Sequence, residues 1–125
     1  MTEKKEAKKL EKRAAKAAAR YLERMGYEIV ERGYTCPFGT ADIVAWDCGT
    51  LVFIDVSVSV LGDDSFPDDY PTPAKRARAE LVAGSYLAGS DDVDHAVRFD
   101  SISVLVVTPD RAFVRHHRDV LNGAI

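Results

Sequence analysis

Residues 39–57 read GTADIVAWDCGTLVFIDVS, and this stretch decides the fold. It holds one run of β-branched and aromatic residues, Thr40–Trp46, and the start of a second, Leu51–Val60. Such runs predict β-strands. The four residues between them include Gly49, which permits the tight reversal of a hairpin. We therefore expect two adjacent antiparallel strands in this part of the chain.

The register of this hairpin brings two aspartates together. A two- or four-residue loop centred on Cys48-Gly49 sets Val44 opposite Phe53. By the same register, Asp42 faces Asp55. Directly opposed Cβ atoms lie roughly 5 Å apart, and like charges at that distance destabilise the pair. Something should compensate this repulsion, unless the sheet end is open to water or the register slips by one residue.

A divalent cation is the natural partner for two such carboxylates. Mg²⁺ and Mn²⁺ prefer carboxylate, carbonyl and water oxygens, so either ion would turn the repulsion between Asp42 and Asp55 into coordination. The backbone carbonyl of Val56 would supply a further ligand. The pattern thus predicts a Mg²⁺ or Mn²⁺ site, with a water-screened, metal-free pair as the alternative.

The flanking segments predict an α/β protein. Apolar residues recur at helical spacing over Leu10–Met25, and Tyr27–Tyr34 predicts an edge strand bent at its glycine. After an acidic loop, Thr72-Pro73 is typical of a helix start. Phe99–Val107 predicts a buried strand and Ala112–Arg115 a short one. The expected order is helix, three strands, helix, two strands, then a helical turn.

Length and composition favour one small domain in a reducing compartment. A chain of 125 residues fits one domain, in which residues 1–10 would be a frayed extension of the first helix. A membrane helix needs a run of about 18 apolar residues, and no run in this sequence approaches that length. The charged N-terminus does not resemble a signal peptide. Cys36 and Cys48 are too few for a disulfide framework. We expect a cytoplasmic protein with no membrane contact and with free thiols, one disulfide bridge between them being the alternative.

The first helix is basic, whereas the rest of the chain is acidic. Residues 1–24 carry nine Lys and Arg against four Glu, a net charge of +5. Because the whole chain has a net charge of −3, the remaining residues carry −8. Lys8, Lys12 and Lys16 are candidates for contacts with nucleic-acid phosphates. A Lys/Glu-rich helix is more often only a solvated face, and that reading stays open.

Several short motifs in unbroken order resemble the YraN-like family of predicted endonucleases. The motifs are GTADIVA at 39–45, LVFIDVS at 51–57, Lys75, RFD at 98–100 and AARYL at 18–22 before Gly26-Tyr27. The resemblance covers roughly residues 14–122. That family is similar to the PD-(D/E)xK nucleases and the Holliday-junction resolvases. The resemblance therefore implies a restriction-endonuclease-like α/β fold, with a central mixed sheet flanked by helices.

The resemblance also implies site roles, and the chain departs from the pattern at several of them. Asp42 takes the place of the first metal-ligating acid and Asp55 that of the second. The family's strand then continues to a catalytic lysine, but Ser57 stands here. Thr40 and Ala15 stand where the family usually has glutamate. Losing one electrostatic group at such a site commonly costs about 10²–10³ in rate, so we expect weakened or lost hydrolysis.

Three functions remain open at this stage. The first is a Mg²⁺-dependent endonuclease acting on DNA or RNA, with branched or single-stranded DNA among the substrates, in which Lys75 replaces the missing lysine. The second is a non-catalytic relative that binds nucleic-acid phosphates through Lys75, Arg76 and Arg78 and through the first helix. The third is a scaffold for protein partners. The sequence does not define an oligomeric state.

Other polar residues are expected to be structural. Arg98 and Asp100 flank a core phenylalanine, which predicts a local ion pair rather than a catalytic role. His116 and His117 are adjacent and are predicted to lie on a surface helical turn, where their side chains point in different directions.

Overall fold

In the computed structural model, the described residues are 2–60, 71–89 and 96–121. They form the predicted order of helix, three strands, helix and two strands. The predicted acidic loop before the second helix falls almost wholly outside these residues. The elements are α1 (Thr2–Arg24), β1 (Glu28–Cys36), β2 (Gly39–Asp47), β3 (Thr50–Val60), α2 (Pro73–Ala88), β4 (Ala96–Thr108) and β5 (Arg111–His117).

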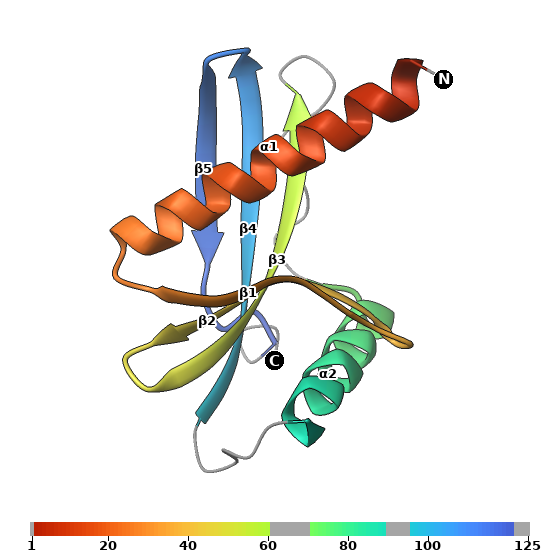
Figure 1. Ribbon diagram of the computed structural model, residues 1–125, viewed down its shortest axis with the longest axis vertical. Helices are drawn as coiled ribbons and strands as arrows, with labels where there is room; N and C mark the ends of the chain where they lie inside the picture. Colours follow the sequence, from red (N-terminus) through yellow and green to blue (C-terminus); the bar gives the residue numbers. More distant parts are fainter. Residues whose placement is uncertain (1, 61–70, 90–95, 122–125) are drawn as a thin grey trace.

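The five strands form one mixed sheet in the order β1-β2-β3-β4-β5. The first three make an antiparallel meander, β3 and β4 are parallel, and β5 returns antiparallel to β4. Helix α1 crosses one face of the sheet, and α2 lies near the β1–β2 hairpin (Figure 1). This is a restriction-endonuclease-like fold, as the resemblance implied. Neither described helix is long and apolar enough to cross a membrane.

The β2–β3 hairpin forms in the predicted register. Its two-residue turn, Cys48-Gly49, has φ values of 49° and 86°, the positive angles that tight hairpin turns require. Trp46 therefore pairs with Leu51, and the ladder continues to the Ile43–Ile54 pair. The alternative of a one-residue slip is wrong.

The first half of strand β3, from Leu51 to Ile54, is buried on both of its faces. Val52 and Ile54 belong to the core under α1, where Ala14 and Ala18 allow the helix to lie close to the sheet. Phe53 packs in a second core on the opposite face, together with residues of α2. Fully burying one such side chain contributes about 1.5–3 kcal/mol, so this strand anchors both layers.

The sheet forks at Asp42. The ladder between β2 and β3 ends at the Ile43–Ile54 pair, and beyond it the β1–β2 hairpin curves away from β3 (Figure 1). Side-chain alternation also breaks here, because Ala41 and Val44 share one core while Ile43 lies in the other. Across from this break, Gly33 of β1 adopts a φ of 72°, which confirms the predicted bend.

The C-terminal end of the sheet corrects one prediction. The two histidines do not lie on a surface helical turn, because β5 continues through them as far as His117. The side chain of His116 is only 4% exposed. The strand is longer than predicted because β4 offers it a pairing edge as far as Ser101.

The left-handed backbone at Gly33 makes a testable prediction. Gly33→Ala should lower the free energy of unfolding by about 1–2 kcal/mol, because an L side chain is strained at positive φ even though its Cβ would meet no neighbouring atom. Gly84→Ala is the matched control. It lies within α2 in equally open space and should raise stability by about 0.5–1 kcal/mol. Urea denaturation measures both, and equal effects would contradict the proposed strain.

Candidate functional site

The carboxyl group of Asp42 fills the fork between β2 and β3. Its Oδ2 atom accepts a hydrogen bond of 2.7 Å from the backbone amide of Val56. Its side chain also hydrogen-bonds the side chain of Asp55. The two aspartates therefore meet as the hairpin register predicted, although the backbone ladder ends one pair before them.

A hydrogen bond between two carboxyl groups requires a proton on one of them. Burial, together with the bond to Asp55, raises the pKa of Asp42 to about 7 from a usual 3.8, against the opposing effect of the Val56 amide. The charges of Asp55 and Glu11 raise it further. The raised pKa means that Asp42 keeps its proton up to about pH 7, and this proton reduces its repulsion with Asp55 in the absence of a cation.

Glu11 is a neighbour of the pair that the sequence did not indicate. It lines a hollow under α1 together with Ala15, Asp42 and Val56. Glu11 lies one helical turn before Ala15, the position where the YraN-like pattern usually has glutamate. Residues four apart share a helix face, so this spacing was the signal that could have found it.

The donors at the fork fit a Mg²⁺ or Mn²⁺ ion. The amide and carbonyl of one strand residue point to the same side, so the Val56 carbonyl is directed into the fork with its amide. Mg²⁺ is usually held by one or two carboxylates and several waters. Within the described residues, no three His, Cys, Asp or Glu side chains are close enough to bind one ion together. Glu11 therefore acts on this site at a distance.

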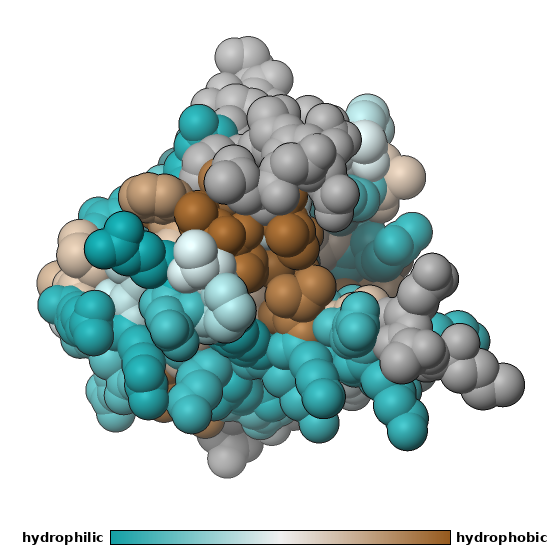
Figure 2. Space-filling view, turned by 90° about the horizontal axis from the view of Figure 1, so that it is seen from above, coloured by the Kyte–Doolittle hydropathy of each residue, from teal (hydrophilic) through white to brown (hydrophobic). Residues whose placement is uncertain are grey.

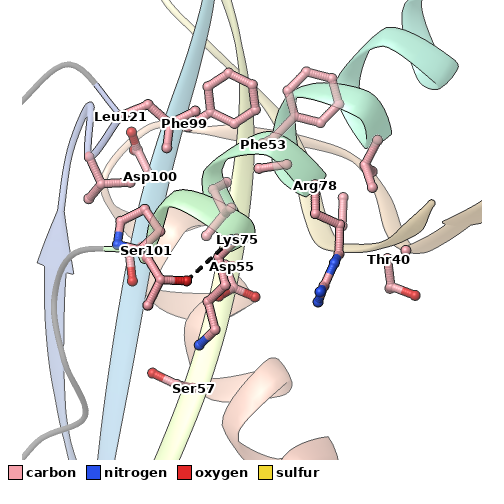
Figure 3. Close-up of a pocket in the computed structure, with 18 residues that line it drawn as sticks. Thr40, Phe53, Asp55, Ser57, Lys75, Arg78, Phe99, Asp100, Ser101 and Leu121 are labelled. Atoms are coloured by element: carbon pink, nitrogen blue, oxygen red, sulfur yellow. Dashed lines mark hydrogen bonds between the residues drawn. The ribbon is translucent and has the colours of Figure 1, made fainter. Parts of the chain in front are cut away.

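A cleft of about 500 Å³ opens on the other side of Asp55, between α2 and the sheet. Its polar residues include Asp55 and Ser57 from β3 and Lys75 and Arg78 from α2. Figure 3 shows these four side chains at one end of the cleft. The structure thus brings two of the three predicted α2 cations, Lys75 and Arg78, to the same cavity as the predicted acid.

The start of α2 fixes where these cations lie. The Oγ1 atom of Thr72 accepts a hydrogen bond of 3.3 Å from the Lys75 amide, so the predicted cap is confirmed (Figure 3). A Cβ atom on Gly39 would come within 3.2 Å of the Arg78 side chain. Glycine at this position lets the β2 strand pass close to the helix and leaves Arg78 free to line the cleft.

The remaining predicted site residues are placed differently. Arg76 donates a hydrogen bond to the backbone carbonyl of Leu121 and does not line the cleft. Ser57 is hydrogen-bonded to the Ser103 hydroxyl at 3.4 Å. Three lysines, at positions 8, 12 and 16, are exposed on α1. Viewed from above, the α1 side of the molecule is covered by hydrophilic side chains (Figure 2).

A second polar cluster surrounds Asp100, which is 1% exposed. Its carboxylate accepts hydrogen bonds from Arg98 Nε at 2.9 Å and from the Tyr27 hydroxyl at 3.1 Å, and it lies 2.8 Å from His116 Nε2. Burial alone would raise the pKa of Asp100, but bonds from His116, Arg98 and the Asp119 amide outweigh it and hold that pKa well below its usual range. The predicted Arg98–Asp100 pair is confirmed, and the role of His116 is new.

The raised pKa of Asp42 predicts how stability depends on pH. The folded chain holds the Asp42 proton up to about pH 7, whereas the unfolded chain releases it near 3.8, so the stability due to this group is lost as pH rises through about 7. Asp42→Asn keeps an acceptor for the Val56 amide and removes the charge. It should raise the free energy of unfolding at pH 8 in metal-free buffer by about 1–2 kcal/mol, after allowance for solvent screening.

The control for this measurement is Asp110→Asn, on the exposed turn between β4 and β5, which should change stability little. Added Mg²⁺ should narrow the gap, since only the wild type gains by binding the ion. Chemical denaturation at several pH values measures both effects. A loss of stability in Asp42→Asn at pH 8 would contradict the repulsion between the two carboxylates.

Comparison with known proteins places the chain among uncharacterised bacterial relatives. Residues 14–104 match the model of the uncharacterised protein family UPF0102. A UPF0102 protein of Beutenbergia cavernae is 38% identical over 105 residues, which cover 84% of this chain and 89% of the relative. Another, of Geobacter sulfurreducens, is 35% identical over 99 residues, or 79% of this chain and 77% of the relative. This chain therefore belongs to the UPF0102 family, the YraN-like group that its sequence motifs indicated.

Proposed function

We propose that the chain is a cytoplasmic, endonuclease-like protein that binds nucleic acid and whose metal-dependent hydrolysis is weakened by Ser57. One observation carries the proposal: Asp55 lies beside Asp42 on one side and, on its other side, lines a cleft that also holds Lys75 and Arg78. Two acids forced together next to two cations are suited to a phosphodiester, whose phosphate carries negative charge. Family membership supports the fold on which this arrangement depends.

The two acids would hold the cation. Bound by Asp42, Asp55 and the Val56 carbonyl, Mg²⁺ or Mn²⁺ would lower the pKa of a water molecule near the phosphate. Deprotonation of Asp42 would accompany binding, so the affinity for the cation should increase as pH rises through about 7. Lys75 and Arg78 would hold the phosphate from the opposite wall of the cleft.

Ser57 explains why hydrolysis would be slow. Its hydroxyl is neutral and bonds the Ser103 hydroxyl, so it offers no positive charge to a developing phosphorane. Lys75 lies in the same cleft and is exposed, on a flexible stem. It is the candidate for partial replacement of the missing lysine. If the replacement fails, the same geometry describes a non-catalytic nucleic-acid-binding relative or a protein scaffold.

Restoring the strand lysine tests the catalytic part of the proposal. Ser57→Lys should raise Mg²⁺-dependent cleavage of branched or single-stranded DNA by about 10²-fold, because one electrostatic group at such a site contributes about that much. Thr40→Glu and Ala15→Glu are added in further variants to complete the ligand set. Gel-based cleavage assays on DNA and RNA substrates provide the measurement.

Two controls define the outcome of this assay. Ser57→Lys combined with Asp42→Asn should lose the gain, because the cation then loses a ligand. Robust wild-type cleavage that survives Lys75→Ala would show that the catalytic centre lies elsewhere. No gain in any restored variant, together with no metal binding by calorimetry, would favour the scaffold.

The basic helix makes a second prediction. Reversing Lys8, Lys12 and Lys16 to glutamate should weaken oligonucleotide binding and reduce its dependence on salt, because fewer counterions are released. Reversal of Arg32, Arg111 and Arg115 gives the same change in net charge at exposed positions outside α1 and serves as the control. Fluorescence anisotropy at several salt concentrations measures both. Equal behaviour of the two triple variants would show that only net charge matters.

A further inference from the structure

The cleft beside Asp55 has two chemically different ends. At one end lie the charged and hydroxyl groups of Asp55, Ser57, Lys75 and Arg78. At the other end lie the rings of Phe53 and Phe99 (Figure 3). These rings are stacked on each other, with centroids 5.7 Å apart and planes at 26°. A ligand that fills this cavity must carry a charged group at one end and a flat apolar group at the other.

Exposure distinguishes the two ends further. Lys75 and Arg78 are exposed. A phosphate bound to them would therefore keep part of its contact with water. Phe53 is 5% exposed and the neighbouring Val82 is 4% exposed, so the aromatic end lies deep. A phosphate would therefore stay at the mouth, and the flat part of the ligand would enter the cavity.

We propose that this cleft takes one unstacked nucleobase of a single-stranded or branched nucleic acid, with the adjoining phosphate held by Lys75 and Arg78. The inference rests on the proposed function and names its substrate class. A cavity of about 500 Å³ is of the size that encloses a small ligand. Base rings stack favourably on aromatic side chains whatever the base, which suits the phenylalanine end.

The same geometry excludes a base within an intact duplex. A paired base is covered on both faces by its neighbours and cannot enter a cavity unless it leaves the stack. Single strands, loops and branch points already supply unpaired bases, so they avoid most of the unstacking cost. The position of Asp55 at the charged end then places the phosphodiester next to the inserted base beside this acid.

The test uses fluorescein-labelled 12-nucleotide probes and the full chain, with Ca²⁺ in place of Mg²⁺ to limit cleavage. One probe is single-stranded DNA, the second is the same strand with every internal base removed, and the third is the duplex. The wild type should bind the first probe about tenfold or more tightly than the second, since one stacked base contributes that much. It should also prefer the single strand to the duplex.

A pair of variants on one helix locates the effect. Ala79 lines the cleft, whereas Ala77 is exposed on α2 and does not. Ala79→Leu should fill the cavity and reduce binding of the single strand to the level of the base-free probe. Ala77→Leu adds the same atoms outside the cavity and should bind as the wild type does. Thermal unfolding checks that both variants fold.

The outcomes separate the inference from the proposed function. Equal binding of the intact and base-free probes by the wild type would overturn the base pocket while leaving phosphate binding in place. Equal binding of the single strand by folded Ala79→Leu and folded Ala77→Leu would also overturn the base pocket. Failure of the wild type to bind any probe would overturn the proposed function and this inference together. If Ala79→Leu does not fold, the comparison of probes on the wild type decides.

Discussion

The hydrogen bond from the Val56 amide to Asp42 is the constraint on which the site depends. Where β2 leaves β3, the ladder ends and a partly buried backbone donor loses its strand partner. An unpaired buried donor costs about 1–3 kcal/mol, so an acceptor is needed at that point. Asp42 supplies one, and in doing so it places a carboxyl group against Asp55. The two acids thus lie side by side because the Val56 amide needs an acceptor where the β2–β3 ladder ends.

The polar cluster around Asp100 connects several elements at a place where, unlike at the fork, the strands remain paired. Through Arg98 it joins Asp47, at the end of β2, to β4, and through Tyr27 it reaches the segment after α1. His116 brings in β5, and its other ring nitrogen lies 3.2 Å from the Tyr21 hydroxyl of α1. A buried carboxylate with several donors is strongly destabilised by the loss of any one of them. This cluster therefore fixes the relative positions of four elements.

Local signals predicted most of the fold, and long-range contacts account for what they missed. Gly49 and Thr72 act within a few residues of themselves, so the hairpin register and the start of α2 followed directly from the sequence. The contact between His116 and Asp100 depends on how far β5 pairs along β4, which no local pattern specifies. The two aspartates were found because hairpin pairing is nearly local, whereas Glu11 reaches them from another element. The sequence did not predict the apolar end of the cleft, because Phe53 and Phe99 meet only through the parallel pairing of β3 with β4.

That parallel pairing has a consequence for how the protein folds. Phe53 pairs with Phe99 and Ser57 with Ser103, so each contact closes a loop of 46 residues. The β2–β3 hairpin, in contrast, closes over two residues and can form early. Loop-closure entropy opposes the longer contacts until α2 has crossed from β3 to β4. Asp42 and Asp55 can thus come together in a nascent chain before β4 is added. The cleft is complete only after α2 and β4 have packed against β3.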